Sequence, residues 1–193
     1  GFFEASLEYQ TTLNPECNEV DINIIICEGR AGRIKKIIFS GLNSCEKNEI
    51  LDLMVTKEYN FFTSWITNEG TYNEDAIAQD QFVILNYLQN KGYADARVNI
   101  EVSEAAQKNR ILIYIHADKG DLYQIGNISF EGNTLFDDDE ISNRILCSTG
   151  SCYSPEAIRK TIENITTLYG KWGYIDTIVD YEPRLVENAC AYT

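Results

Sequence analysis

Positive charge is scarce in this 193-residue chain, which carries 16 Lys and Arg residues against 30 Asp and Glu residues. The formal net charge is −14 at pH 7. Nucleic acids are bound through Lys and Arg contacts with phosphates, and anionic lipid headgroups attract the same side chains. We therefore expect no nucleic-acid partner and no tight contact with an anionic membrane surface. The charge mainly favours solubility.

The sequence also lacks a long hydrophobic run. Its apolar stretches all fall short of the roughly 18 residues that a membrane-spanning helix needs. The opening GFFEASLEYQ has neither the basic start nor the apolar segment of a secretory signal. We expect any export signal or membrane anchor to have been removed or to lie outside this sequence. At 44% hydrophobic residues, the chain still has enough apolar material for a globular core.

Histidine is almost absent, and the six cysteines are scattered without a CxxC pair. Metal sites need clustered ligands, and nucleophilic catalysis needs a base beside the nucleophile. With His116 as the one histidine, we predict no metal site, no cofactor and no catalytic residue, and therefore no enzyme. The closest cysteines, Cys147 and Cys152, fit either a disulfide in an oxidising compartment or two reduced thiols.

What the sequence does contain is an internal repeat. A Gly-aromatic pair followed by alternating residues begins at Gly1, at Gly92 (91 residues later) and at Gly173 (81 residues after that). Upstream residues repeat at the same offset of 91. Ile34, Ile37, Phe39, Gly41 and Ile50 match Ile125, Ile128, Phe130, Gly132 and Ile141. A period of this length predicts tandem domains.

The period divides the chain into three repeats. Residues 1–29 are predicted to be the C-terminal β-hairpin of a first repeat. Residues 30–120 form a complete middle repeat with an aromatic insertion near 57–72, and residues 121–193 form a third repeat truncated in its last strand. Glycines at the two junctions, Gly29, Gly32 and Gly120, are the predicted hinges, and the two-glycine junction is expected to bend more readily.

Each repeat is predicted to follow the order β-α-α-β-β. In the middle repeat, residues 33–39 form a β-branched strand, and residues 47–55 a short helix. A longer helix runs from Asn73 to the glycine at 92, which takes the positive φ of a helix end. Strands at 94–102 and 110–117 complete an α+β fold, a three-stranded mixed sheet with two helices on one face.

The two last strands differ in pattern. Residues 94–102 alternate between apolar and polar side chains, which is typical of an edge strand with one wet face, whereas 110–117 is apolar on both faces and is expected in the centre. In the third repeat, the acids Asp137–Glu140 lack the alternation of a calcium loop and are expected to begin a helix, as Ser154 followed by proline also is. His116 is interpreted as a hydrogen-bonded sheet residue.

The ordered motifs resemble the POTRA (polypeptide-transport-associated) domain. They are the aromatic-x-Gly start at Phe39 and Phe130, a tyrosine before the long helix, the GY that ends it, and a glycine hinge before the next repeat. Tandem units with short hinges resemble the periplasmic part of BamA-type outer-membrane protein assembly factors. On this resemblance, the chain holds the tail of the second POTRA domain, the whole third and most of the fourth.

The exposed edge of such a sheet can pair with another extended chain. We therefore predict a peptide-binding edge, which the resemblance also implies, at Ala94, Asp95, Arg97, Asn99 and Glu101. The alternative is that these are ordinary solvent-facing residues.

The aromatic insertion is a second candidate surface. It resembles the insertion of the third POTRA domain, and its apolar residues are Tyr59, Phe61, Phe62, Trp65 and Ile66. They fit either a partner-binding surface or an insertion that folds back over its own domain.

The resemblance implies a non-enzymatic scaffold on the periplasmic face of the outer membrane. It would bind unfolded outer-membrane β-barrel precursors and accessory lipoproteins, and the full-length protein would carry a C-terminal β-barrel. A two-partner secretion transporter that recognises one exported substrate is an alternative. A purely structural envelope scaffold is a third reading.

Overall fold

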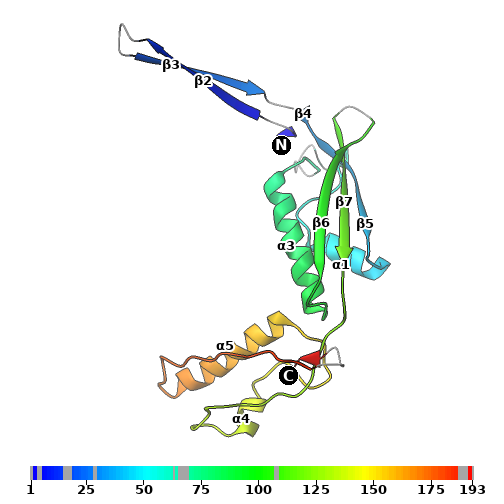
Figure 1. Cartoon of the computed structure of the whole chain (residues 1–193). Coiled ribbons are helices and arrows are strands. Elements are labelled where there is room, and N and C mark those ends of the chain that lie inside the picture. The colour runs from blue at the N-terminus through cyan, green and yellow to red at the C-terminus, as the bar shows by residue number, and fades with distance from the viewer. Residues whose placement is uncertain are drawn as a thin grey trace. The chain divides into compact units, whose positions relative to one another are not determined.

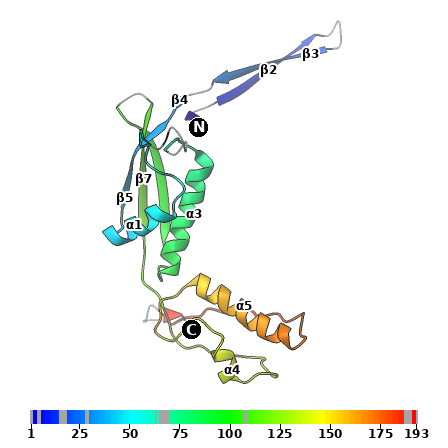
Figure 2. The same ribbon diagram turned by 180° about the vertical axis from the view of Figure 1, so that it is seen from behind.

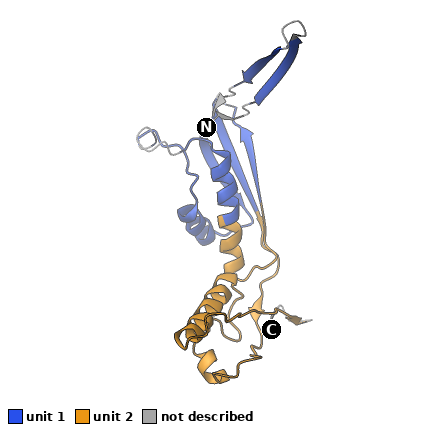
Figure 3. Ribbon diagram, turned by 90° about the vertical axis from the view of Figure 1, so that its left-hand side faces the viewer, with its two compact units in different colours: residues 1–82, 99–116 blue, residues 83–98, 117–193 orange. Residues whose placement is uncertain are grey.

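The computed structural model describes residues 2–3, 6–14, 19–27, 30–62, 64, 70–106, 109–186 and 191–192. It falls into two compact units, shown in different colours in Figure 3. Unit 1 comprises residues 1–82 and 99–116, and unit 2 comprises residues 83–98 and 117–193. Three elements of the middle repeat run from one unit into the other, namely α3 (Glu74–Asn90), β6 (Arg97–Glu104) and β7 (Arg110–Asp118).

The sheet of the middle repeat has the order β5-β7-β6, so the apolar strand β7 is central and β6 is an edge, as predicted (Figure 1). Strand β5 (Arg33–Ser40) pairs in parallel with β7, from Arg33 opposite Arg110 to Ser40 opposite His116. A register irregularity falls between Ile34 and Lys36. The fold class is therefore the predicted α+β arrangement with a three-stranded mixed sheet.

Helix α1 (Ser44–Leu53) lies in front of the sheet in Figure 2, on the same side as α3. It begins three residues earlier than predicted because Asn43 and Glu46 form a capping box. The Asn43 side chain accepts from Glu46 N at 2.9 Å, and Glu46 Oε2 accepts from Asn43 N at 2.8 Å. The helix ends at Leu53, two residues before the predicted end at residue 55.

The core of unit 1 is aliphatic. Its buried hydrophobic residues are Ile34, Ile37, Ile50, Met54, Ile111, Ile113 and Ile115. One buried carboxylate stabilises the chain after α1: Asp80 is 0% exposed, and its two oxygens accept from Val55 N at 2.7 Å and Thr56 N at 2.9 Å. The backbone N–H groups of the two residues after α1's C-cap are therefore hydrogen-bonded by the protein itself and do not depend on water.

The first repeat contributes a long hairpin. Strand β2 (Ser6–Asn14) pairs antiparallel with β3 (Glu19–Cys27) over its whole length. Flanking it, β1 (Phe2–Phe3) pairs antiparallel with β4 (Arg30–Ala31). All the hairpin side chains described are exposed.

The third repeat lies in unit 2. Its two helices, α4 (Asp138–Ser142) and α5 (Pro155–Lys171), begin where the sequence predicted, with Asp137 and Ser154 as N-caps. Its apolar cluster is Phe136, Ile141, Ile165 and Leu168, with Phe130, Ile145, Tyr169 and Val179 packed against it.

The sheet of the third repeat is short. Strands β8 (Gln124–Ile125), β10 (Ala191–Tyr192) and β9 (Leu185–Val186) lie in the order β8-β10-β9. This order repeats β5-β7-β6, with the last strand central and parallel to the first. The longer strands expected from the repeat are not formed over 126–130 and 175–184. Each of these two segments lies at an edge of the sheet and can pair only with the central strand. That strand, β10, has two described residues, so its partners are equally short.

No helix within the described part of the chain combines the length and the apolar character needed to cross a membrane.

Candidate peptide-binding edge

Strand β6 is an open edge of the middle repeat's sheet. It pairs with β7 on one side, and among the described residues no strand pairs with its other side. Its side chains alternate as predicted: Asn99 and Glu101 are exposed, whereas Val98, Ile100 and Val102 are half-buried. A strand edge of this kind presents backbone N–H and C=O groups to which another extended chain can bind.

The strand begins later than the sequence suggested. Ala94 and Asp95 lie in a turn before β6, in which Ala96 N donates to Tyr93 O at 3.1 Å. Because alanines stand at 94 and 96, the alternation of apolar and polar residues continues through this turn. The pattern alone could therefore not show where the turn ends and the strand begins. The Asp95 carboxylate instead accepts a 2.6 Å hydrogen bond from Tyr123 Oη.

The edge candidates that remain in the strand are Arg97, Asn99 and Glu101, all exposed. Asn99 Nδ2 donates to Glu101 Oε1 at 3.1 Å on the solvent face. These polar side chains keep the open edge soluble.

The opposite edge of the sheet, β5, is covered by the two ends of the insertion. Ile34 N donates to Gly70 O at 2.8 Å, Tyr59 N to Ile34 O at 2.8 Å, and Ile37 N to Glu58 Oε1 at 2.9 Å. The sequence analysis did not single out Glu58 or Gly70. The two edges of one sheet therefore differ, since Ile34 and Ile37 on β5 have hydrogen-bond partners on the outer side and β6 has no strand partner in the described structure.

Within the insertion, Tyr59 is a packing residue. The guanidinium groups of Arg33 and Arg110 lie 4.6 and 5.5 Å from the centre of its ring, within cation–π range. Gly70, at φ +78°, passes so close that a Cβ there would lie 2.3 Å from Tyr59 Cα. This part of the insertion folds back on its own repeat.

Phe61 and Phe62 behave differently from Tyr59. They are 74% and 81% exposed, and their rings meet edge to face at a centroid distance of 5.7 Å. Trp65 and Ile66, the other aromatic and aliphatic candidates, lie outside the described residues. The insertion thus combines an anchored tyrosine with an exposed phenylalanine pair.

The predicted hinge glycines occupy different environments. Gly32 is buried, its carbonyl accepts from Tyr72 N at 2.9 Å, and a Cβ there would lie 2.0 Å from Ile111 Cδ1. Close packing against Ile111 therefore explains why residue 32 is a glycine better than a role as a hinge does. Gly29 lies outside the described residues, and Gly120 adopts φ +64°.

The segment after β7 is held within unit 2 by several contacts. Tyr123 N donates to Gly92 O at 2.8 Å, and Gly92 has φ +103°. A Cβ on Gly92 would meet Leu122 Cδ1 at 2.8 Å, so the glycine serves both the helix end and this close approach. Lys119 Nζ lies 5.0 Å from the centre of the Tyr93 ring.

Asn90, the last residue of α3, caps the helix of the next repeat. Its Oδ1 accepts from Ser154 Oγ at 2.8 Å and from Glu156 N at 2.9 Å, at the start of α5. The Ser154 hydroxyl in turn accepts from Ala157 N at 3.2 Å. Sequence analysis missed this contact because its partners lie 64 and 66 residues apart in the chain.

Of the two states considered for Cys147 and Cys152, the structure has the reduced one, because both are free thiols. Cys147 Sγ lies 3.6 Å from Thr161 Oγ1 instead. His116 lies on β7 with its Nδ1 2.7 Å from Ser40 Oγ on β5, a sheet residue as interpreted. In the described part of the chain, no group of three or more His, Cys, Asp or Glu residues is placed to hold a metal ion.

Comparison with known proteins identifies the domain type. The POTRA family model, described as surface antigen variable number repeat, matches residues 32–120 and 123–189. The chain belongs to the POTRA family. It is 28% identical over 170 residues to the outer membrane protein assembly factor BamA of Neisseria meningitidis, covering 86% of this chain and 21% of that protein. The chain thus spans about a fifth of the length of this relative.

Solved structures show the same POTRA fold. BamA POTRA3-5 of Haemophilus influenzae matches 98% of this chain and 70% of its own length, with a TM-score of 0.55 at 20% identity. BamA of Haemophilus ducreyi lacking POTRA domains 1-3 matches 84% of this chain and 28% of its own length, with a TM-score of 0.59 at 18% identity.

Proposed function

We propose that this chain is a non-enzymatic periplasmic scaffold that binds unfolded outer-membrane β-barrel precursors by adding their strands to the β6 edge. The observation that carries the proposal is the difference between the two edges of one sheet. The β5 edge is covered by Glu58, Tyr59 and Gly70, whereas β6 has no strand partner among the described residues. The similarity to BamA proteins, named as outer membrane protein assembly factors, supports a role in barrel assembly.

Strand addition suits clients of varied sequence. The affinity would come from backbone hydrogen bonds, and the transmembrane strands of barrel precursors alternate apolar and polar residues as β6 does. In an added client strand, successive side chains would point to opposite faces of the sheet, so its apolar side chains could lie on the same face as those of β6. On this proposal, the chain is joined in the full-length protein to a C-terminal barrel and works at the periplasmic face of the outer membrane.

Accessory lipoproteins are the proposed partners of a second surface, the exposed pair Phe61 and Phe62. Aromatic side chains that stand out from an anchored loop are common interface anchors. Tyr59 belongs to the anchor and not to this surface, because two arginines and Gly70 pack around it. Replacing Phe61 and Phe62 by Ala should abolish lipoprotein capture and leave the melting temperature unchanged.

The edge proposal is tested by site-specific photocrosslinking. A photoreactive residue at Asn99 or Glu101 should crosslink a ten-residue peptide of alternating apolar and polar residues. The same residue at Lys36, an exposed position on the covered β5 edge, is the matched control and should not. Equal crosslinking from both edges would contradict the proposal, and binding of one peptide sequence alone would favour the dedicated secretion transporter.

A backbone test separates strand addition from side-chain contact. Ala105 N donates to Arg110 O, so N–H groups of odd-numbered residues in β6 face β7 and those of even-numbered residues face outward. Val102→Pro removes an outward N–H, whereas Val102→Ala trims the side chain and keeps it. Peptide binding should weaken at least about tenfold more for the proline variant. Equal losses would show that β6 does not pair with the peptide.

A further inference from the structure

The outer face of the middle repeat's sheet is partly apolar. Helices α1 and α3 lie on the other face, so this face, which is turned to the viewer in Figure 1, has no described helix over it. The odd-numbered residues of β7 from 111 to 117 are buried, so its even-numbered residues point to the outer face. Two of these are apolar, half-buried Leu112 and Tyr114, which is 39% exposed. On β5, Ile38 lies opposite Tyr114 in the sheet register.

Three cations lie at one end of these apolar residues. Lys36 on β5 is exposed and lies opposite Leu112. Arg33 and Arg110 lie opposite each other earlier in the same register, and their guanidinium groups share the ring of Tyr59, at 4.6 and 5.5 Å from its centre. We refer to the six residues as the outer-face patch, which is Arg33, Lys36, Ile38, Arg110, Leu112 and Tyr114.

The positive charge of this patch has no counter-charge within the described structure. Two neighbouring guanidinium groups repel each other, and the Tyr59 ring between them attracts both without carrying a negative charge. The carboxylates of Glu58 and Glu101, at the two edges of the sheet, accept hydrogen bonds from Ile37 N and Asn99 Nδ2. No described carboxylate forms an ion pair with the three cations. This patch therefore concentrates positive charge in a chain whose net charge is −14.

The first repeat shows that the fold does not require these residues. Strand β3 is the earlier copy of β7, because both of its ends lie 91 residues before those of β7. Isoleucine recurs at this offset on one face of the two strands, at residues 22 and 24 and at residues 113 and 115. On the other face, the residues that stand 91 positions before Arg110, Leu112 and Tyr114 are Glu19, Asp21 and Asn23. One strand face is thus acidic and polar in the first repeat, and basic and apolar in the next.

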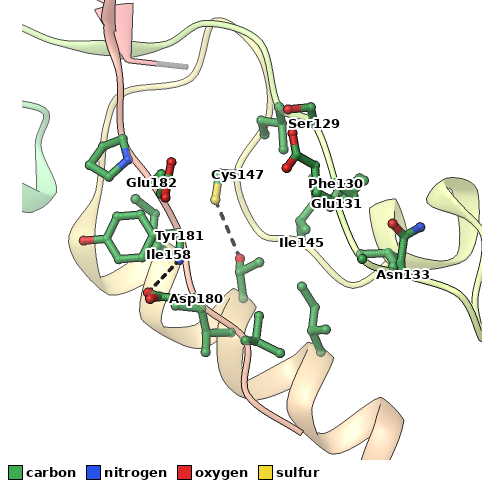
Figure 4. A pocket seen from close by; sticks show the side chains of 18 of the residues that line it. Ser129, Phe130, Glu131, Asn133, Ile145, Cys147, Ile158, Asp180, Tyr181 and Glu182 are labelled. Carbon is green, nitrogen blue, oxygen red and sulfur yellow. Dashed lines mark hydrogen bonds between the residues drawn. The ribbon is translucent and has the colours of Figure 1, made fainter.

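The third repeat differs from the middle one in the same way. The counterparts of Lys36 and Ile38, 91 residues further on, are Asn127 and Ser129, which are exposed and uncharged (Ser129 is labelled in Figure 4). At these positions, neither neighbouring repeat has the apolar and basic character of the middle repeat. Apolar side chains that are left at the surface beside cations without counter-charges are typical of an interaction surface.

We propose that the outer-face patch binds an acidic, extended segment of a partner protein. Carboxylates of the partner bind Arg33 and Arg110, since a guanidinium group holds a carboxylate through two parallel hydrogen bonds, and Lys36 adds a further donor. An apolar side chain of the partner packs on Leu112 and Tyr114. Because Arg110 and Leu112 are two residues apart on one strand face, the partner's acids precede or follow its apolar anchor by about two residues, or roughly 7 Å.

Charge complementarity selects this occupant. A basic segment would be repelled, and a purely apolar one would cover the cations without supplying a counter-charge. An anionic membrane surface would be repelled by the 30 Asp and Glu residues of the chain. The proposal does not depend on the β6 edge, because the patch uses side chains on a sheet face whereas the edge uses backbone groups.

The proposal is tested by fluorescence anisotropy of a labelled eight-residue peptide mixed with the whole chain. The peptide carries two Asp residues, with Leu and Phe at the second and fourth positions after them, and its control has Asn in place of both Asp residues. The acidic peptide is expected to bind at least about tenfold more tightly than the control. Its affinity should fall as the salt concentration rises from about 0.05 to 0.5 M, because exposed charges are screened.

Two substitutions locate the bound peptide. Lys36→Glu should weaken its binding at least about fivefold, whereas Lys171→Glu, at an exposed lysine of unit 2, changes the net charge equally and should have little effect. Tyr114→Asn gives β7 the residue type that β3 has at position 23, and it should also weaken binding at least about fivefold. The exposed Phe82→Asn is its control. Thermal unfolding checks that every variant is folded.

Val102→Pro separates this proposal from the one made for the β6 edge. The variant loses an outward N–H of the edge and keeps the outer-face patch, so the acidic peptide should bind it as tightly as it binds the unchanged chain. Loss of acidic-peptide binding in folded Val102→Pro would place the peptide at the edge and overturn the outer-face proposal.

Three further results would contradict the proposal. The first is an acidic peptide that does not bind at concentrations up to about 1 mM. The second is equal affinity for the Asp and Asn peptides, or equal affinity of Lys36→Glu and Lys171→Glu for the acidic peptide, since the cations would then not recognise the ligand. The third is binding of phosphatidylglycerol vesicles without binding of the peptide, which would assign the patch to a membrane surface.

Discussion

Tyr123 Oη donates a 2.6 Å hydrogen bond to Asp95 Oδ2, which ties the segment after β7 to the turn before β6. Tyr123 is buried apart from 9% of its surface, so its hydroxyl depends on this acceptor. Its backbone is fixed as well, because its N–H donates to Gly92 and its carbonyl accepts from Tyr153 N at 2.9 Å. The bond explains why Asp95 is not a free residue of the proposed peptide-binding edge.

Removing this hydrogen bond should cost stability. Tyr123→Phe is expected to lower the free energy of unfolding by about 1 kcal/mol, because the ring stays buried and one bond is lost. A double-mutant cycle with Asp95→Ala, measured by urea unfolding, should give a coupling energy of about 0.5 kcal/mol or more. The exposed Tyr181→Phe is the control and should change little. Additive losses would show that the two side chains do not interact.

Asn90→Ala should loosen the start of α5. The amide of Glu156 loses its acceptor, and Ser154 loses the partner of its hydroxyl, with an expected cost of about 1–2 kcal/mol. Hydrogen exchange at the Glu156 amide is the direct measurement and should be faster in the variant. The exposed Asn127→Ala serves as a control. Unchanged exchange at Glu156 would show that Asn90 does not cap this helix.

Asp80 is expected to be the most sensitive polar position in unit 1. Asp80→Ala leaves the buried amide of Thr56 and the partly buried amide of Val55 without an acceptor, and it should destabilise the protein by about 3 kcal/mol or more. Asp80→Asn keeps one acceptor oxygen and should lie in between, while the exposed Asp52→Asn should have almost no effect. Chemical unfolding followed by tryptophan fluorescence measures all three. Equal values for Asp80→Ala and Asp52→Asn would contradict the role given to the buried carboxylate.

Two glycines should respond to alanine in opposite directions. Gly32→Ala places a Cβ 2.0 Å from Ile111 Cδ1 and should lower stability by about 1–3 kcal/mol. Adding Ile111→Val removes that methyl group and should restore part of the loss.

Gly170→Ala is the matched comparison for Gly32→Ala. It lies in α5, where a Cβ would have nothing within 4 Å beyond its chain neighbours and its own helix backbone, and it should raise stability by about 0.5–1 kcal/mol. Thermal unfolding measures all these variants. A tolerated alanine at residue 32 would favour a hinge there over close packing.

Much of the architecture follows from local pattern. Alternation over β6 and the apolar run of β7 predicted which strand is central, because a strand covered on both sides needs apolar residues on both faces. Ser154 with Pro155 and Asp137 with its acids predicted two helix starts, since capping depends on neighbours in sequence. The repeat of Gly92 and Gly173 marked both helix ends, where φ is +103° and +88°.

The candidate site was less predictable. The sequence pointed to the correct strand but not to its start, and it treated Tyr59 and Phe61 as one aromatic surface. Glu58 and Gly70 were missed because their role is to hydrogen-bond the outer edge of a strand more than 20 residues earlier in the chain. Which edge is covered depends on such distant partners, and no local pattern contains them.

By itself, the sequence determined the repeat, the order of elements and the polarity of each face, since these follow from side-chain type and spacing along a single chain. The tertiary structure alone decided that β5 is covered while β6 has no strand partner in the described structure. It also decided that Gly32 is packed against Ile111 and that Asn90 caps α5. These features arise from contacts between distant segments, whose distances and directions exist only after the chain has folded.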